Sequence, residues 1–262
     1  MLNFRNTSLL FCLLIVGMVL LEFVIEIRWY HYLLLIFVYS LLLCYGSITV
    51  QSNFYMKVLN NGTVPRTQAG AKQLAISFDD GPADQYTSGI LQVLDDLKVP
   101  ATFFCIGKNI AGREALLNKI ITDGHIIGNH SYSHAFWFDI YSARRMKADL
   151  QQMTEAVLQA TGLKPRLFRP PYGVTNPNLA KATAAHGLIS IGWNIRSLDT
   201  VVKNPQKLLD KVLKSVKPGA IVLFHDTSET TFSILPSFIQ SVRDRGYEIV
   251  RLDKMLNIAA YA

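Results

Sequence analysis

Hydrophobic and polar positions divide the chain into an apolar N-terminal part and a longer part of mixed character. Residues 9–21 are uncharged and largely apolar, and residues 29–50 carry no formal charge. From residue 72 onward, short apolar runs alternate with segments in which apolar residues recur every three or four positions. This change of pattern predicts a membrane-associated segment followed by an α/β domain.

The apolar part predicts two transmembrane helices, at about 8–27 and 29–50, in an anchor that covers residues 1–52. The second stretch alone is long enough to cross about 30 Å of hydrocarbon. The first must extend through Glu22 and Glu26, acids that a membrane tolerates near its interface. We therefore expect a helical hairpin that makes the protein integral to a membrane.

A cleaved signal peptide is the competing interpretation of the first apolar stretch. It requires a small-residue cleavage site after the apolar core, and residues 22–26 (Glu-Phe-Val-Ile-Glu) do not provide one. A second long span also follows, so a retained anchor is favoured. Basic residues flank both spans, at Arg5, Arg28 and Lys57, and the positive-inside rule therefore leaves the orientation open.

The globular part, residues 72–256, shows the alternation of strands and helices that is typical of parallel sheets. Strands are predicted at 73–78, 100–105, 125–128, 166–168, 188–193, 220–224 and 247–250. Helices are predicted at 86–97, 113–122, 141–161, 177–186, 205–216 and 233–245. Residues 53–71 are polar and rich in turn-forming residues, and they are predicted to form a linker.

Ionisable residues follow five of the seven predicted strands at their C-terminal ends. In a (β/α) barrel all these ends meet on one face, whereas an open doubly wound sheet spreads them along a line. A barrel explains the pattern better, and with about seven parallel strands it is expected to be incomplete or distorted. The residues are Asp79, Asp80, His130, His134, Arg169, Asp199 and His225.

Two adjacent carboxylates, Asp79 and Asp80, follow the first predicted strand. Like charges this close disfavour joint ionisation, and a nearby cation removes that cost. His130 and His134 lie four residues apart, so both can point at one cation. With one aspartate they offer two nitrogens and one oxygen, which predicts a divalent metal site with one carboxylate left for proton transfer. Zinc is the first choice, and cobalt, nickel, manganese and iron stay open.

The other strand-end residues fit the hydrolysis of an amide or ester. A bound metal lowers the pKa of its water, and the spare aspartate can take the proton with Arg169 beside it. His225 can act as a general acid from the opposite side, and Asp199 can raise its pKa.

Three further residues are candidates for contact with a substrate. The backbone N–H of Tyr172, in the stiff loop Arg169-Pro-Pro-Tyr-Gly173, can face a developing oxyanion. Trp193 and Leu223 can form the wall of a small apolar pocket for an acyl methyl group, although both fit equally well as ordinary core residues.

Composition adds little about partners. The net charge of +7 lies in the C-terminal part, because residues 1–52 balance two basic residues with two acids. This charge suits anionic partners such as cell-wall polymers or lipid headgroups. Ordinary solvated lysines scattered over helices are the favoured interpretation, because the sequence has no block of five like charges. No motif supports nucleic-acid binding. No protein partner is implied. Cys105 stands in an apolar run and is predicted to be a small core residue.

Five short motifs together resemble the polysaccharide deacetylases, carbohydrate esterase family four. They are Ser77-Phe-Asp-Asp-Gly-Pro82, His130-Ser-Tyr-Ser-His134, Arg169-Pro-Pro-Tyr-Gly173, the stretch from Trp193 to Asp199, and Leu223-Phe-His225. The resemblance covers about residues 72–252. It implies a distorted (β/α) barrel that removes acetyl groups from N-acetylglucosamine polymers such as chitin or peptidoglycan, or O-acetyl groups from xylan.

The resemblance also divides the roles, which the spacing alone leaves open. It implies Asp79 as base, Asp80, His130 and His134 as metal ligands, Arg169 as the group that orients the base, His225 as acid, Asp199 as the group that tunes it, and Tyr172 as part of the oxyanion hole. Many members carry a tryptophan directly after the fourth-motif aspartate, where this chain has Thr200, so the shape of the glycan groove is expected to differ.

The family usually acts outside the cytoplasm, which implies a domain facing the periplasm or the exterior. Three alternatives to deacetylation of an N-acetylated polymer stay open from the sequence. These are an O-acetyl esterase on xylan or another acetylated glycan, a catalytically silent glycan-binding protein tethered to the membrane, and an enzyme for a lipid-linked sugar.

Overall fold

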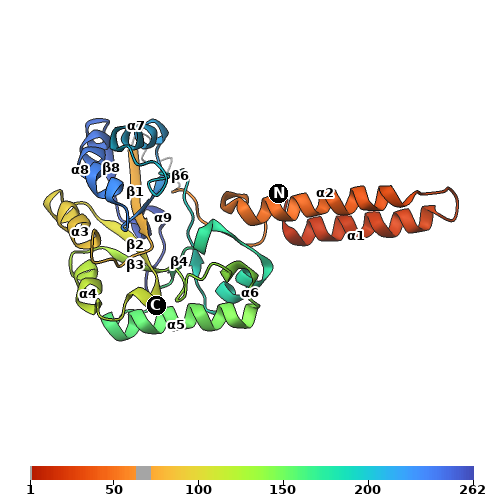
Figure 1. Ribbon diagram of the computed structural model, residues 1–262, viewed down its shortest axis with the longest axis horizontal. Helices are drawn as coiled ribbons and strands as arrows, with labels where there is room; N and C mark the ends of the chain where they lie inside the picture. The colour runs from red at the N-terminus through yellow and green to blue at the C-terminus, as the bar shows by residue number, and fades with distance from the viewer. Residues whose placement is uncertain (1, 63–71) are drawn as a thin grey trace.

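The structure is a computed structural model that describes residues 2–62 and 72–262, and it consists of a long helical hairpin attached to an α/β domain (Figure 1). The hairpin contains α1 (Phe4–Leu21) and α2 (Trp29–Ile48). Both helices are long and apolar enough to cross a membrane, a test that signal sequences also meet, and at most 11% of either apolar window is buried.

Helix α1 begins and ends earlier than the predicted range 8–27. It begins at Phe4 because the side chain of Asn3 caps it by accepting the N–H of Asn6. It ends at Leu21, so Glu22 and Glu26 lie in the turn between the helices rather than inside a span. Both acids are thereby placed at the tip of the hairpin, which lies far from the α/β domain (Figure 1).

The α/β domain is built on one sheet in which every pairing between strands is parallel, in the order β5-β4-β3-β2-β1-β7-β6. An additional strand, β8, pairs with the first residues of β1. The strands are β1 (Lys72–Asp79), β2 (Ala101–Cys105), β3 (Ile126–Asn129), β4 (Leu167–Phe168), β5 (Ile189–Ser190), β6 (Ile195–Arg196), β7 (Ala220–His225) and β8 (Tyr247–Ile249). Because β5 and β6 do not pair with each other among the described residues, the sheet is an open, distorted barrel, and the predicted fold is confirmed.

Helices connect the strands and cover the outside of the barrel (Figure 1). They are α3 (Thr87–Asp96), α4 (Glu114–Thr122), α5 (Ala143–Thr161), α6 (Pro177–Ala185), α7 (Pro205–Ser215), α8 (Glu229–Asp244) and α9 (Leu252–Leu256). Polar side chains fix several of the starts: Ser142, Asn176 and Ser228 each accept a backbone N–H from the first turn of the helix that follows. The short helix α9 and the two-residue strand β6 had no counterpart in the sequence pattern.

Apolar side chains fill both faces of the sheet, as expected for parallel strands. Along β1, Ile76 and Phe78 pack in the cluster under the outer helices, whereas Ala75 belongs to the cluster inside the barrel. Cys105 is fully buried in the outer cluster, as predicted. This packing holds the C-terminal ends of the strands in fixed positions on one face.

The segment after the hairpin contacts the domain over much of its described length. Of the predicted linker 53–71, residues 63–71 lie outside the described residues. In the other part, the N–H of Leu59 donates to Ser190, the N–H of Gly192 donates back to Leu59, and Gly62 donates to Gly219. Residues 59–62 therefore lie between the end of β5 and the start of β7, and part of the predicted linker belongs to the barrel.

The hairpin also contacts the domain directly. The backbone N–H of Thr175 donates to the carbonyl oxygen of Ser47, and its hydroxyl donates to that of Gly46, in the last turn of α2. The side-chain amide of Gln51 donates to the carbonyl oxygen of Trp193. These contacts join the end of α2 to the loops that follow β4 and β5.

Candidate active site

The C-terminal ends of β1, β3, β4 and β7 surround a cavity of about 110 Å³. Most of the predicted site residues meet there as expected from a barrel. Two do not line the cavity: Arg169 lies beneath Asp79, and Asp199 follows β6 rather than the fifth strand and lies behind His225. The cavity is lined by Asp79, Asp80, His130, His134, Pro170, Tyr172, Gly173, Trp193, Arg196, Leu223 and His225.

Asp80, His130 and His134 form a group that can hold a metal ion. One atom from each residue lies within 4.8 Å of the other two. The Nε2 atoms of His130 and His134 each lie 3.5 Å from Oδ1 of Asp80. A set of two imidazole nitrogens and one carboxylate oxygen leaves coordination positions for water and substrate.

Two observations show that these residues fit a metal ion. Oδ1 of Asp80 is buried without a hydrogen-bond partner, although it faces both histidines. Nδ1 of His130 lies 2.8 Å from the carbonyl oxygen of Arg169, which can only accept, so Nδ1 carries the proton and Nε2 is left to bind. A second hydrogen bond of this kind is the usual device that orients a ligating histidine.

The charges around Asp80 favour its ionised form. Burial alone would raise the pKa of the Asp80 carboxyl, but the neighbouring imidazoles of His130, His225 and His134 lower it below its usual range. Burial lowers the pKa of His134 to about 4, which keeps that imidazole neutral. An ionised aspartate and a neutral histidine are the forms that ligate metals.

Arg169 holds Asp79 from below the cavity. Its guanidinium is fully buried, and Nη1 donates to Oδ1 of Asp79 over 2.7 Å and to the hydroxyl of Ser77 over 2.9 Å. Nη2 donates to the carbonyl oxygen of Gly192, and the guanidinium stacks on the ring of Phe104. The other oxygen of Asp79 lies 3.8 Å from Nε2 of His130. Arg169 therefore fixes one oxygen of Asp79 and leaves the other facing the metal group.

His225 lies across the cavity and is paired with Asp199. Its Nδ1 lies 2.8 Å from Oδ1 of Asp199, and its backbone N–H donates to Oδ2 over 2.7 Å. Burial alone would lower the pKa of His225, but the hydrogen bond and charge of Asp199 raise it to about 9. Nε2 points toward Asp80 at 3.9 Å from Oδ2. The imidazole is thus protonated near neutral pH and faces the centre of the site.

Tyr172, Trp193 and Leu223 all line the cavity. The side chain of Tyr172 is half exposed and lies against the ring of His134, with 4.6 Å between ring centroids. Trp193 and Leu223 are buried and also belong to the cluster inside the barrel, so they are core residues and cavity wall at once. Their place in the core is therefore confirmed, and contact with an acyl methyl group stays a prediction.

The backbone of the site is unusual. Asp80, His134 and Tyr172 have positive φ angles of 76°, 41° and 57° although none is a glycine. Such conformations cost roughly 1–3 kcal/mol each and persist where the surrounding structure imposes them. Here they turn three site residues toward one cavity.

Comparisons with known proteins agree with this geometry. The family model for polysaccharide deacetylases matches residues 66–191. The chain is 31% identical over 203 residues to the chitooligosaccharide deacetylase of Sinorhizobium fredii, a match that covers 71% of this chain and 93% of that protein. The chain belongs to the polysaccharide deacetylase family. This is the family that the motifs implied, and the relatives it is compared with here are named deacetylases.

Two other members of the polysaccharide deacetylase family extend the comparison. The peptidoglycan-N-acetylglucosamine deacetylase PgdA of Listeria monocytogenes is 33% identical over 192 residues, and the chain spans only 40% of that protein's length. The crystal structure of the Bc1960 peptidoglycan N-acetylglucosamine deacetylase aligns with a TM-score of 0.72 at 25% identity, over 78% of this chain and 95% of that chain.

Several residues that support the deacetylase site had no role in the sequence analysis. Ser77 accepts from Arg169 and donates to the carbonyl oxygen of Val222, so it joins β1, β4 and β7 beneath Asp79. Ser197 and Thr231 both donate to the carboxylate of Asp199. A serine among apolar residues of a strand was the available signal for Ser77. Thr231 lies in a helix 32 positions from Asp199, and the sequence held no such signal for it.

Proposed function

We propose that the protein is a metal-dependent deacetylase of glycans that contain N-acetylglucosamine, of the peptidoglycan or chitin type. The observation that carries the proposal is the convergence, in one cavity, of the metal-ligating group with Asp79 on one side and His225 on the other. The names of the relatives, which act on peptidoglycan and chitooligosaccharides, support this substrate class.

Asp80, His130 and His134 would hold the divalent metal, with zinc as first choice and cobalt, nickel, manganese and iron as open alternatives. When bound, such an ion lowers the pKa of a coordinated water and polarises a carbonyl oxygen. Asp79 accepts the proton of the attacking water through the oxygen that faces the metal group. The ion pair with Arg169 fixes the orientation of Asp79 for this step.

His225 supplies the proton that the leaving amine needs when the amide bond breaks. It is suited to this because Asp199 raises its pKa to about 9 and holds Nδ1, which directs the protonated Nε2 into the cavity. The backbone N–H of Tyr172 stabilises the developing oxyanion. Trp193 and Leu223 enclose the acetyl methyl group, since both present apolar surface to a cavity of small volume.

We also propose that α1 and α2 are a retained membrane anchor over residues 1–52 and that the domain faces the periplasm or the cell exterior. The apolar side chains of the hairpin are largely exposed, which is costly in water and favourable in a bilayer. An extracytoplasmic position is where peptidoglycan, the substrate named for the relatives, is found.

The proposed reaction is tested by acetate release from N-acetylated chitooligosaccharides and peptidoglycan fragments, with the full chain in detergent. Asp80→Ala is expected to lose bound metal and activity. Asp79→Asn is expected to keep stoichiometric metal and lose turnover by at least about 10²-fold, the contribution of a positioned general base. Asp84→Asn, which alters an exposed acid outside the cavity, is the matched control and is expected to behave as the wild type.

Chelation should abolish acetate release and added metal should restore it. Activity that persists in chelator, or that persists in Asp79→Asn, would exclude the proposed mechanism. An O-acetylated xylan fragment tested in parallel shows whether the enzyme prefers an ester to the amide.

A further inference from the structure

The loop between β3 and α5 exposes three large apolar side chains beside the active site. Phe136 is 74% exposed, Trp137 is 64% exposed and Ile140 is 74% exposed. Together they form what we call the loop patch. Phe138, in the middle of the same loop, is fully buried and anchors it in the core. The loop is therefore held in place by one aromatic residue while three others point outward.

The loop patch lies on the side of the domain that carries the hairpin. Asn176 donates to the carbonyl oxygen of Asp139 in the loop, and its neighbour Thr175 donates to Ser47 and Gly46 of α2. In Figure 1, α6, which begins just after Asn176, lies on the side from which the hairpin extends. A short chain of hydrogen bonds thus connects the loop patch to the end of the proposed membrane anchor.

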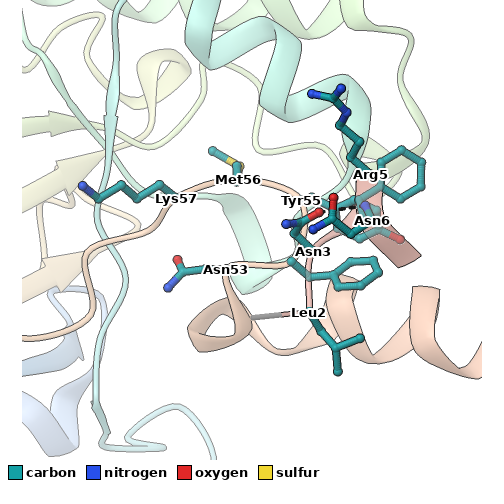
Figure 2. Close-up of a pocket in the computed structure, with 10 residues that line it drawn as sticks. Leu2, Asn3, Arg5, Asn6, Asn53, Tyr55, Met56 and Lys57 are labelled. Carbon is teal, nitrogen blue, oxygen red and sulfur yellow. Dashed lines mark hydrogen bonds between the residues drawn. The ribbon is translucent and has the colours of Figure 1, made fainter. Parts of the chain in front are cut away.

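Basic residues accompany the loop patch. Arg144, Arg145 and Lys147 are exposed in the first turns of α5, and Arg145 stacks on Tyr141 directly after the loop. At the base of the hairpin, Arg5 and Lys57 line a second hollow of about 700 Å³ together with the start of α1 (Figure 2). Aromatic and apolar side chains flanked by cations are typical of surfaces that rest in a lipid headgroup layer.

The catalytic cavity is close to both the loop patch and the base of the hairpin. His134, a proposed metal ligand, precedes Phe136 by two residues, and Gly173 of the cavity wall precedes Thr175 by two residues. Gln51, just after α2, bonds to the carbonyl oxygen of Trp193 in the same wall. Three segments of the cavity wall therefore continue directly into the loop patch or the base of the hairpin.

We propose that the loop patch rests in the headgroup region of the membrane that holds α1 and α2, and that it keeps the catalytic cavity at the bilayer surface. The inference rests on the proposed membrane anchoring. In a protein that is not bound to a membrane, a group of neighbouring exposed apolar side chains often marks a docking site for another molecule. Its continuity with the hairpin and its basic surroundings favour a bilayer with anionic lipids as the occupant. The substrate that suits this placement is an N-acetylated saccharide carried on a membrane lipid.

A sugar-stacking platform is the main rival occupant, because aromatic rings beside a glycan site can bind sugar faces. Ile140, which has no ring, is among the most exposed members of the patch, and this favours lipid. The two occupants predict different outcomes in the same experiment.

The three tryptophans of the chain allow a direct test. Trp29 lies at the tip of the hairpin, Trp137 in the loop patch, and Trp193 is buried at 7% exposure. The full chain is placed in nanodiscs whose lipids are brominated near the glycerol end of the acyl chains, and tryptophan fluorescence is measured. Trp29→Phe keeps Trp137 and therefore reports on the loop patch, whereas Trp137→Phe keeps Trp29 and reports on the hairpin. The double variant keeps only Trp193 and gives the background.

Quenching of Trp29→Phe clearly above the double variant is expected. As a control, Leu158→Trp in the double-variant background places a tryptophan on α5 near Ala160, whose carbonyl oxygen accepts from Asn118 of α4, and this tryptophan should stay unquenched. If Trp29→Phe is quenched no more than the double variant, the proposal is wrong. If Trp137→Phe is also unquenched, the membrane anchoring itself has failed.

Activity provides the second measurement. The double substitution F136S/I140S should lower acetate release from an N-acetylglucosaminyl lipid in the same nanodiscs by roughly tenfold, through lost burial of apolar surface. Release from a soluble chitooligosaccharide should stay unchanged. Equal losses on both substrates would identify a sugar platform and overturn the proposal. A wild-type enzyme that releases no acetate from either would refute the proposed function while leaving the quenching result intact.

Discussion

His125 is a buried histidine at the N-terminal end of β3, on the opposite side of the barrel from the catalytic cavity. Its Nδ1 lies 3.2 Å from the backbone N–H of Ala101 and accepts from it, and its ring packs near Phe103. Burial lowers the pKa of His125 to about 4. Protonation would place an unneutralised charge in the core and remove the acceptor that Ala101 uses.

This histidine predicts a pH-dependent loss of stability. Because the pKa in the folded state lies below the unfolded value of about 6.5, the unfolded chain binds the proton more readily. The contribution of His125 is therefore complete above about pH 6.5 and is lost as pH falls toward about 4, by on the order of 3 kcal/mol. The measurement is the pH dependence of the free energy of unfolding, compared with that of His125→Asn, whose side-chain oxygen can still accept.

His125→Asn should show a smaller decline between these pH values. His186→Gln, which alters a partly exposed histidine directly after α6, should decline like the wild type. Parallel curves for the wild type and His125→Asn would contradict the interpretation.

At this scale the sequence predicted which residues meet but not how each is held. The pairing of Arg169 with Asp79 was expected because an arginine and an aspartate both follow strands of one barrel. The contact of Arg169 with Ser77 and Gly192 depends on the register of β1, β4 and the loop after β5, which no local pattern encodes. Spacing alone also could not assign the two aspartates, since adjacent residues follow the same strand.

At the scale of elements, the loop after β4 is shaped by a close approach of two segments. Gly173 has φ of +73°, and a Cβ atom built on it would lie 2.5 Å from Cη2 of Trp193. Gly187, which follows α6, has φ of +62°, but a Cβ atom there would meet no other group within 4 Å. The two glycines share a backbone conformation and differ in their surroundings.

Gly173→Ala is expected to lower the free energy of unfolding by about 2–4 kcal/mol, from backbone strain together with overpacking against Trp193. Gly187→Ala, which brings strain alone, is expected to cost about 1 kcal/mol. Urea denaturation followed by tryptophan fluorescence measures both. In addition, Gly173→Ala should reduce acetate release because it moves Trp193 or Tyr172 at the cavity. If the two substitutions lower the free energy of unfolding equally, then Trp193 moves away from the new methyl group without an energetic cost, and the predicted overpacking is wrong.

Elements with strong periodicity were predicted well, and short ones were not. The range 141–161 became α5 at Ala143–Thr161, and the range 177–186 became α6 at Pro177–Ala185, because caps and glycines mark their ends. Strand β6 has only two residues, and its existence depends on pairing with β7. Helix α8 begins at Glu229, four residues before the predicted start, because Ser228 caps it.

At the scale of the whole molecule, the start of α1 and the end of α2 both lie at the end of the hairpin that faces the domain. Phe4 at the start of α1 donates to the carbonyl oxygen of Phe54, and α2 ends against the loop that contains Thr175. Both ends therefore lie on the side of the domain, and the tip with Glu22, Glu26 and Arg28 lies at the far end (Figure 1). This arrangement puts the domain and the tip on opposite sides of a membrane that the hairpin crosses.

The proposed orientation predicts the behaviour of reporters fused to the C-terminus. Alkaline phosphatase, which is active only outside the cytoplasm, should be active there, and green fluorescent protein should not fluoresce. A reporter inserted at the tip should give the reverse result. The opposite pattern would place the domain in the cytoplasm and contradict the proposed localisation, but it would leave the chemistry of the site unaffected.

The sequence predicted a linker between the anchor and the domain, whereas in the structure part of that linker is hydrogen-bonded to the barrel. Residues 53–62 read as a linker because they are polar and contain Asn60 and Gly62, but polar residues also suit a chain that fills the open side of a barrel through backbone hydrogen bonds. Such bonds leave no trace in the hydrophobic pattern, so the contact of Leu59 with Ser190 and Gly192 could not be foreseen.

The position of residues 59–62 decides how a soluble form of this enzyme can be made. A form that begins at residue 72 retains every predicted strand but exposes the backbone of Ser190, Gly192 and Gly219, which would then need water or another chain as partner. A form that begins at residue 53 keeps those partners but gives up the hairpin with its bonds to Thr175, the bond from Gln51, and the packing of Val50 in the cluster inside the barrel. Secretion, proteolytic release or shedding from the membrane is therefore compatible with an intact barrel only when the cut falls before Leu59.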